Sequence, residues 1–179
     1  MKKRIAIASI AVGLLAGCAD NPPRADTDTE AVPGTAAPAA AAKRGVLVVL
    51  PARFADNLDI DRVKRECAML RTFNGAVLRY GDAYAMTLRK RQSLDEVRPG
   101  QSVLLVEYEE VAANEMNALT LRPGSEATVK ASIMKDGELV SSMTKAIGSR
   151  VSFGACDRLD KIATAGAKTV AKWASRQPY

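Results

Sequence analysis

The sequence predicts an α+β domain in which a small, mostly antiparallel sheet carries two main helices on one face. Three observations support this fold class. Residues 45–50 form a β-branched apolar run, residues 127–147 alternate around a central Asp136-Gly137, and the chain closes on an amphipathic helical pattern. The domain is expected to occupy residues 45–179, behind an export signal at 1–17 and a disordered tether at 18–44.

The first half of the domain predicts a strand followed by a helix. Residues 45–50 are continuously apolar and end at Pro51, as expected of a short buried strand. The helix should then present one apolar face at helical spacing, with N-cap oxygens just before it. The apolar positions are Ile60, Val63, Cys67 and Leu70, and the caps are Asp56, Asn57 and Asp59.

The middle of the domain is harder to interpret. Asn74-Gly75 would interrupt or end this helix, because neither residue favours a helix interior. Residues 76–94 are compatible with helix or irregular structure, and Arg89-Lys90-Arg91 reads as a solvated run of charges. A turn at 98–101 then leads into a strong strand prediction at 102–111.

The second half carries the clearest local patterns. Apolar and polar residues alternate over 127–135, Asp136-Gly137 is a favoured two-residue hairpin turn, and residues 138–147 return as the second strand. In the last helix, Asp157 is the predicted N-cap, and Asp160 favours the helix dipole. Its apolar and small residues recur at helical spacing, and these are Leu159, Ile162, Ala163, Gly166, Val170, Trp173 and Ala174.

The amino-terminal segment has the layout of a secretory signal. Lys2, Lys3 and Arg4 precede an apolar run over 5–15, which is too short to span a bilayer as a helix. Leu15-Ala16-Gly17-Cys18 closely resembles the lipobox of bacterial lipoproteins. The resemblance implies lipidation of the Cys18 thiol, cleavage before Cys18 and stable anchoring through two or three acyl chains. Ala19, in place of Asp, implies sorting to the outer membrane rather than the inner membrane.

Residues 19–44 have the composition of a disordered tether. Prolines, alanines and a glycine leave no apolar period to bury. As a flexible coil such a segment would reach on the order of 28 Å, which would let the domain stand away from the membrane. Half of the formal net charge of +6 lies in the signal, so the remaining positive charge is that of an ordinary soluble surface.

Two cysteines remain if Cys18 is lipidated. An exported compartment favours oxidation, and Cys67 and Cys156 allow a single pairing. We therefore expect a structural disulfide between the first and last helices. Two free thiols or a redox pair are the alternatives, although the sequence holds no CxxC motif.

Several kinds of chemistry are disfavoured. The chain has no histidine, which excludes histidine-dependent catalysis, and two distant cysteines are too few ligands for a metal site. No cofactor motif is present, and the low aromatic content argues against nucleic-acid binding. Ser142 and Lys145 match an SxxK motif, but on a strand they would point to opposite faces. Glu107 and Glu109 could form a carboxylate pair for a hydrolase, although charged strand ends are more common.

One charged surface invites a binding hypothesis. Four cations lie along the polar side of the last helix and could contact lipid headgroups or another polyanion, although a solvated helix face is the more common explanation. These residues are Lys161, Lys168, Lys172 and Arg176.

Taken together, a lipobox, a Pro/Ala tether, a strand ending in proline and a closing long helix resemble small envelope lipoproteins with domains akin to the TolB amino-terminal domain. The curli-secretion lipoprotein and auxiliary lipoproteins of lipid-transport ABC systems have similar layouts. The resemblance covers residues 45–177 and implies a non-enzymatic binding or scaffolding role, accessory to a transport or assembly machine. We expect an unknown protein partner in the envelope. The alternatives are a lipid- or polyanion-binding module and, last, a hydrolase.

Overall fold

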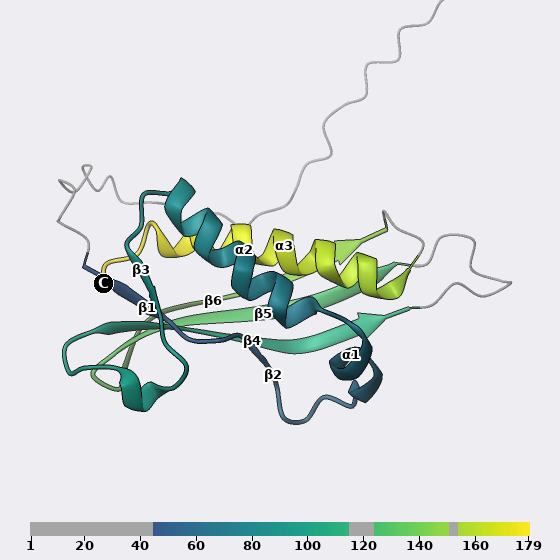
Figure 1. Cartoon of the computed structure of the whole chain (residues 1–179), viewed down its shortest axis with the longest axis horizontal. Coiled ribbons are helices and arrows are strands. Elements are labelled where there is room, and N and C mark those ends of the chain that lie inside the picture. Colours follow the sequence, from purple (N-terminus) through teal and green to yellow (C-terminus); the bar gives the residue numbers. More distant parts are fainter. Residues whose placement is uncertain (1–44, 115–123, 151–153) are drawn as a thin grey trace, which may run out of the picture. The chain divides into compact units, whose positions relative to one another are not determined.

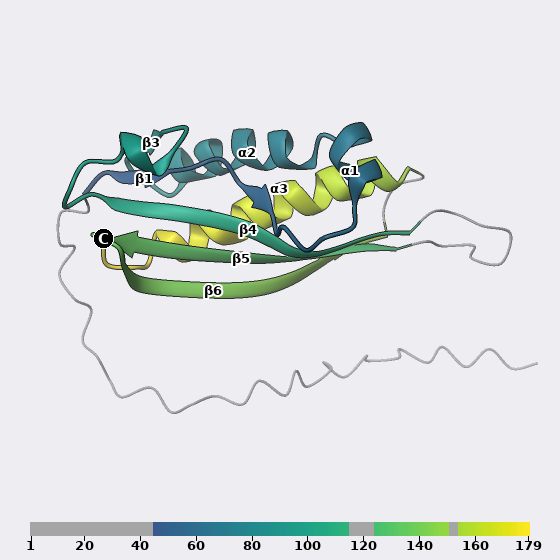
Figure 2. The same ribbon diagram turned by 90° about the horizontal axis from the view of Figure 1, so that it is seen from below.

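The computed structural model describes residues 45–114, 124–150 and 154–179, which form one sheet with helices on one of its faces (Figures 1 and 2). The helices are α1 (Asp61–Glu66), α2 (Met69–Ala83) and α3 (Ala155–Ala174), with a 3-10 turn at Leu94–Glu96. The strands are β1 (Leu47–Val49), β2 (Arg53–Phe54), β3 (Leu88–Lys90), β4 (Ser102–Ala113), β5 (Ser125–Lys135) and β6 (Glu138–Ser149). The predicted α+β class is confirmed. The signal and the tether lie outside the described residues.

The sheet has the strand order β3-β1-β4-β5-β6, and its long strands β4, β5 and β6 are antiparallel neighbours. The short strands are parallel, because β1 pairs with both β3 and β4. β2 also runs parallel to β4, further along it. Pro51 lies between β1 and β2, and its missing N–H cannot extend the ladder. Most of the paired residues are nevertheless antiparallel, as predicted.

The core lies between the helices and one sheet face, which we call the inner face. Alternate residues of β4 and β5 point toward α2 and α3, and the largest of them is the fully buried Tyr108. The ring of Phe73 on α2 meets Tyr108 edge-on at 5.8 Å between ring centroids. Gly166 lets α3 approach the same ring, since a Cβ at that position would lie only 3.2 Å from the Tyr108 Oη.

The hairpin forms as predicted. Asp136 and Gly137 both adopt positive φ angles, as a two-residue turn between twisted strands requires. The last helix is also confirmed, but the prediction of Asp157 as its N-cap is wrong. Gly154 is the N-cap residue without a side-chain hydrogen bond, and Asp157 lies inside the first turn, where its charge still favours the dipole.

The first helical segment differs from the prediction. The helix breaks at Cys67, which has an extended backbone, and α1 begins after Ile60 without a side-chain cap. Asn74-Gly75 neither interrupts nor ends α2. The Asn74 side chain is used instead in a tertiary contact, where its Oδ1 accepts a 2.9 Å hydrogen bond from the backbone N–H of Ala52.

The ambiguous stretch at 76–94 continues α2 to Ala83 and then forms β3. The charges of Arg89 and Lys90 are exposed, as expected, but they lie on an edge strand rather than in a loop. Edge strands commonly carry such charges, because these discourage pairing with other chains. No helix among the described residues combines the length and apolar character needed to cross a bilayer.

The Tyr108 hydroxyl is buried without a hydrogen-bond partner among the described residues, and burial raises the pKa of this phenol well above its usual range. Tyr108→Phe should therefore raise the free energy of unfolding by about 1 kcal/mol, since it removes an unsatisfied buried group. Unfolded tyrosine ionises near pH 10 whereas folded Tyr108 stays neutral, so this site loses stability as the pH rises above about 10.

Urea unfolding at pH 7 and pH 10.5 would measure both effects. The variant should lose less stability than the parent between the two pH values. A decrease of more than 1 kcal/mol at pH 7 would instead mean that the hydroxyl has a bonding partner.

Candidate binding site on the outer face of the sheet

The face of the sheet that points away from the helices, the outer face, carries a second and smaller apolar cluster. Val48, Leu50 and Val103 are buried there, and Val97 and Leu105 pack against them. Within residues 45–114, 124–150 and 154–179, this cluster is covered by the segment between β3 and β4, a loop that contributes Val97, and not by a helix layer (Figure 2).

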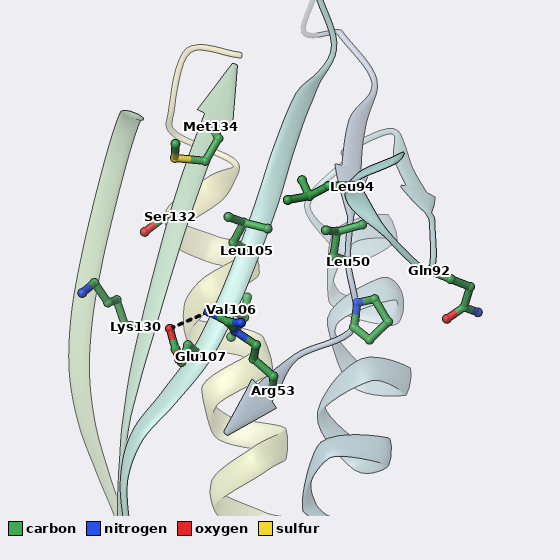
Figure 3. Close-up of a pocket in the computed structure, with 11 residues that line it drawn as sticks. Leu50, Arg53, Gln92, Leu94, Leu105, Val106, Glu107, Lys130, Ser132 and Met134 are labelled. Carbon is green, nitrogen blue, oxygen red and sulfur yellow. Dashed lines mark hydrogen bonds and ion pairs between the residues drawn. The ribbon is translucent and has the colours of Figure 1, made fainter. Parts of the chain in front are cut away.

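A groove of about 440 Å³ opens beside this loop (Figure 3). Its apolar side is built by Leu50 and Pro51 after β1, Leu94 from the loop, and Leu105 and Met134 from the neighbouring strands β4 and β5. Because β4 and β5 are hydrogen-bonded to each other, their backbones are already satisfied here. Recognition in this groove would therefore depend on side chains.

The described residues expose three large apolar side chains, and one of them lines this groove. Leu94 is the lining residue and is 57% exposed. Leu139 is 59% exposed and lies opposite the groove residue Met134 in the ladder, and Val140 follows at the irregularity in the pairing of β5 with β6 and is 40% exposed. Exposed apolar side chains in and beside a groove are typical of interaction sites. We call Leu50, Leu94, Leu105 and Met134 the outer groove, and Leu139 borders it.

The other end of the groove is polar, and its charges are paired. Arg53 Nη2 lies 3.4 Å from Glu107 Oε2. A dashed line marks this ion pair in Figure 3. Lys130 Nζ lies 2.9 Å from Glu109 Oε1. The hydrogen bond and the charge of Glu109 raise the pKa of Lys130, so this amine stays protonated. The groove therefore offers an apolar surface with a charge-balanced end.

These ion pairs bear directly on the hydrolase hypothesis. Glu107 and Glu109 are separated by an irregularity in the ladder between Tyr108 and Glu110, and each of the two carboxylates contacts a different cation. They do not form the isolated carboxylate pair that the hypothesis needs. Ser142 pairs with Ser132 on the outer face, whereas Lys145 pairs with the core residue Val129, so the SxxK residues are on opposite faces of β6.

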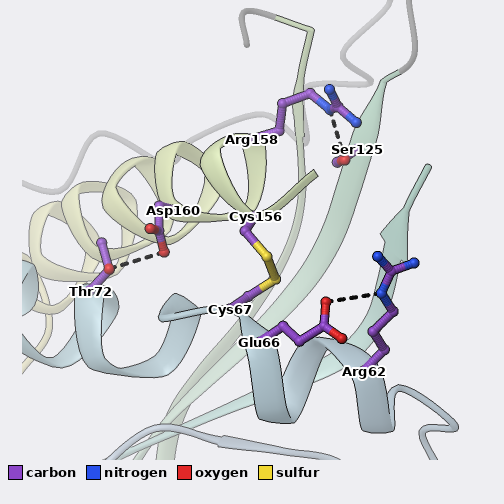
Figure 4. Close-up of a disulfide and its surroundings, with 8 residues drawn as sticks. All are labelled: Arg62, Glu66, Cys67, Thr72, Ser125, Cys156, Arg158 and Asp160. Carbon is purple, nitrogen blue, oxygen red and sulfur yellow. Dashed lines mark hydrogen bonds and ion pairs between the residues drawn. A yellow bond between two sulfur atoms is a disulfide. The ribbon is translucent and has the colours of Figure 1, made fainter. Parts of the chain in front are cut away.

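The disulfide joins the start of α3 to the break between α1 and α2 (Figure 4). Cys67 and Cys156 are joined, with their Cα atoms 5.0 Å apart. Cys67 occupies the break between α1 and α2, and Cys156 lies in the first turn of α3, so the bond ties the three helices together. Nearby, Thr72 Oγ1 donates to Asp160 Oδ1 over 3.1 Å and links α2 to α3 a second time.

Arg158 is a structural residue that sequence reasoning missed. It is fully buried, its Nε donates to Ser125 Oγ over 3.1 Å, and its Nη2 donates to the backbone oxygen of Asn114. These bonds hold the start of α3 against the end of β4 and the start of β5. Its position four residues before Ile162 on the apolar stripe is the signal that could have revealed its burial.

The four predicted surface cations are all exposed. Lys161, Lys168 and Lys172 lie on α3, on the side away from the sheet, whereas Arg176 follows the end of the helix at Ala174. Lys161 and Lys168 line a shallow groove between α2 and α3, together with Tyr80, Asp157 and Asp160. Within the described parts of the chain, no cluster of three or more potential metal-ligating side chains occurs. Cys18 lies outside the described residues.

Comparison with known proteins identifies no family. No family model and no curated protein matches the sequence. Solved structures with a similar arrangement include a Xanthomonas campestris protein of the DUF330 family, with 11% identity over 74% of this chain and 85% of that chain and a TM-score of 0.49. A minor lipoprotein from Acinetobacter baumannii has 14% identity over 74% and 95%, with a TM-score of 0.46. A lipoprotein from Neisseria meningitidis has 12% identity over 71% and 98%, with a TM-score of 0.44.

Proposed function

We propose that this chain is a lipid-anchored lipoprotein of the bacterial outer membrane, facing the periplasm, whose domain binds an apolar segment of a protein partner in its outer groove. Its role is non-enzymatic and accessory to a transport or assembly machine. The observation that carries the proposal is that the exposed Leu94 lines an apolar groove, and that the exposed Leu139 lies opposite the groove residue Met134.

The chemistry of the groove favours a protein segment over a charged small molecule. A charged ligand would have to displace Arg53 from Glu107 or Lys130 from Glu109, whereas an apolar side chain of a partner gains from leaving water. The groove volume is large enough for a few such side chains, and buried apolar anchors of this kind dominate the affinity of protein interfaces.

The lipobox at Leu15-Ala16-Gly17-Cys18 supports the anchoring, and the composition of residues 19–44 supports a tether that gives the domain access to partners near the membrane. A binding role needs no catalytic group, and Glu107 and Glu109 on the outer face are held in ion pairs.

Site-specific photo-crosslinking tests the groove. A photoreactive residue in place of Leu139 should give one discrete crosslinked product in membranes, whereas the same residue in place of the exposed Ala165 on α3 should give none. Adding Leu94→Asp to the Leu139 variant should reduce the product at least tenfold, because a charge in the groove weakens apolar docking.

Equal yields from the two positions, or a yield insensitive to Leu94→Asp, would contradict the groove as the binding site. Thr144→Asp, also on the outer face but outside the residues that line the groove, is the matched control and should leave the product unchanged.

A further inference from the structure

The helix layer carries an exposed group of cations at one end, which we call the basic end. Lys168 and Lys172 lie on the carboxyl-terminal half of α3, Arg176 follows the end of this helix, and Arg79 lies on the last part of α2. The two helices run in the same direction, since Thr72 bonds to Asp160 near their starts and Tyr80 lines the groove with Lys168 further along. Their final turns therefore lie at the same end of the layer (Figure 1).

Few acidic side chains lie near the basic end. Asp82 is the one carboxylate on the final turns of the two helices, and residues 161–179 contain no acidic residue. Among the described residues, none of the four cations of the basic end forms an ion pair, whereas Arg53 and Lys130 on the outer face are both paired. Lys90 on β3 is also exposed, and β3 adjoins the end of α2, because Leu88 packs against Gly81.

The chain enters the domain at this same end. Gly45 lies beside Tyr179, and a Cβ on Gly45 would be 3.7 Å from the Tyr179 carbonyl oxygen. Figure 1 shows the carboxyl terminus next to the start of β1. An anchor at Cys18 would thus be joined to the domain beside the basic end, and Lys43 and Arg44 immediately precede the entry point.

The opposite face is closer to charge balance. The outer face carries Glu107, Glu109, Glu110 and Glu126 against Arg53, Lys130 and Arg89, which pairs with the outer-face residue Val48. A negatively charged surface orients a molecule whose unpaired cations gather on the helix layer, since it attracts that layer more strongly than the outer face.

We propose that the basic end docks on anionic phospholipid headgroups of the membrane that anchors the chain. Docking in this way turns the helix layer toward the bilayer and leaves the outer groove open to the periplasm. The inference rests on the anchoring in the proposed function but does not depend on what the groove binds. Lysines and arginines near an anionic surface each strengthen such docking about fivefold.

Energy transfer from Trp173 to a dansyl-labelled lipid headgroup tests the docking. Trp173 is the chain's single tryptophan and adjoins Lys172 in the basic end, so the protein needs no label. The mature lipidated chain is reconstituted into vesicles of phosphatidylglycerol with phosphatidylethanolamine, and into vesicles of zwitterionic lipid alone. Transfer should be higher with the anionic lipid and should fall to the zwitterionic level in high salt, which screens the charges.

Matched charge reversals decide whether the basic end is responsible. Lys168→Glu with Lys172→Glu should lower the docking equilibrium more than twentyfold and abolish the excess transfer. Arg65→Glu with Arg71→Glu changes the net charge equally at exposed positions on α1 and at the start of α2, and it should retain the excess. Circular dichroism of both variants establishes that they fold.

Two results would overturn the docking. One is equal transfer in anionic and zwitterionic vesicles, and the other is an equal loss for the two reversal pairs. Leu94→Asp should leave the energy transfer unchanged while it removes the photo-crosslink at the groove. The transfer therefore tests the membrane docking alone, and the crosslink tests the partner site alone.

Discussion

Reduction of the Cys67–Cys156 disulfide is expected to lower the free energy of unfolding by about 4–5 kcal/mol. The bond closes a loop with a sequence separation of 89 residues, and a cross-link of that span removes much of the conformational freedom of the unfolded chain. Domains of this size are typically stable by only 5–15 kcal/mol, so the reduced protein should be close to unfolding at 37 °C.

Urea unfolding followed through Trp173 would measure this loss in oxidised and reduced protein. The variant with both Cys67→Ala and Cys156→Ala should match the reduced protein, because it lacks the cross-link without leaving reactive thiols. A difference of less than 1 kcal/mol between oxidised and reduced protein would contradict a structural role and favour a redox role for the pair.

Reduction of the disulfide should destabilise some parts of the domain more than others. α1 has six residues, too few to be stable as an isolated helix, and Cys67 follows it directly. Hydrogen exchange in α1 should therefore accelerate on reduction more than exchange in β4 or β5, which are held by two-sided strand pairing.

The elements that were predicted correctly are those whose signals are local. The alternation over 127–135, the Asp136-Gly137 turn and the stripe of α3 each arise within about twenty residues, and the structure contains all three. In such segments, local preference and tertiary packing favour the same conformation, which is why sequence reasoning succeeds there.

The elements that were missed depend on contacts between distant residues. Asn74 lowers helix propensity locally, but its side chain satisfies the backbone of Ala52, and the helix continues through it. Likewise, Arg89 and Lys90 give no strand signal, and β3 forms because β1 offers it a parallel neighbour. Local propensity is a weak guide where a tertiary contact offsets it.

The outer groove could not be predicted for the same reason. Leu50, Leu94, Leu105 and Met134 come from four separate segments, and the sequence alone does not tell which of their apolar side chains stay exposed. Periodicity assigns residues to faces of one element, but it does not show that one sheet face lacks a covering layer. The helix cations were predicted because they belong to a single element.

Cys18→Ala is expected to abolish incorporation of radiolabelled palmitate and to leave an unprocessed precursor. Lipobox processing requires the thiol, because the acyl group is attached to it before cleavage. The uncleaved signal should hold the precursor at the inner membrane, whereas the parent protein should fractionate with the outer membrane. Metabolic labelling and density-gradient separation of the two membranes would measure both changes.

The remaining cysteines provide the control for this substitution. The double variant Cys67→Ala, Cys156→Ala should keep the label, since lipidation is expected at the Cys18 thiol and not at these two cysteines. Label that persists in Cys18→Ala would contradict lipidation at this site. A domain without the anchor should show how strongly the basic end binds on its own. If a cleavable signal without a lipobox exports the domain, no acyl chains hold it to the bilayer. Its binding to anionic vesicles should then be weak and salt-sensitive.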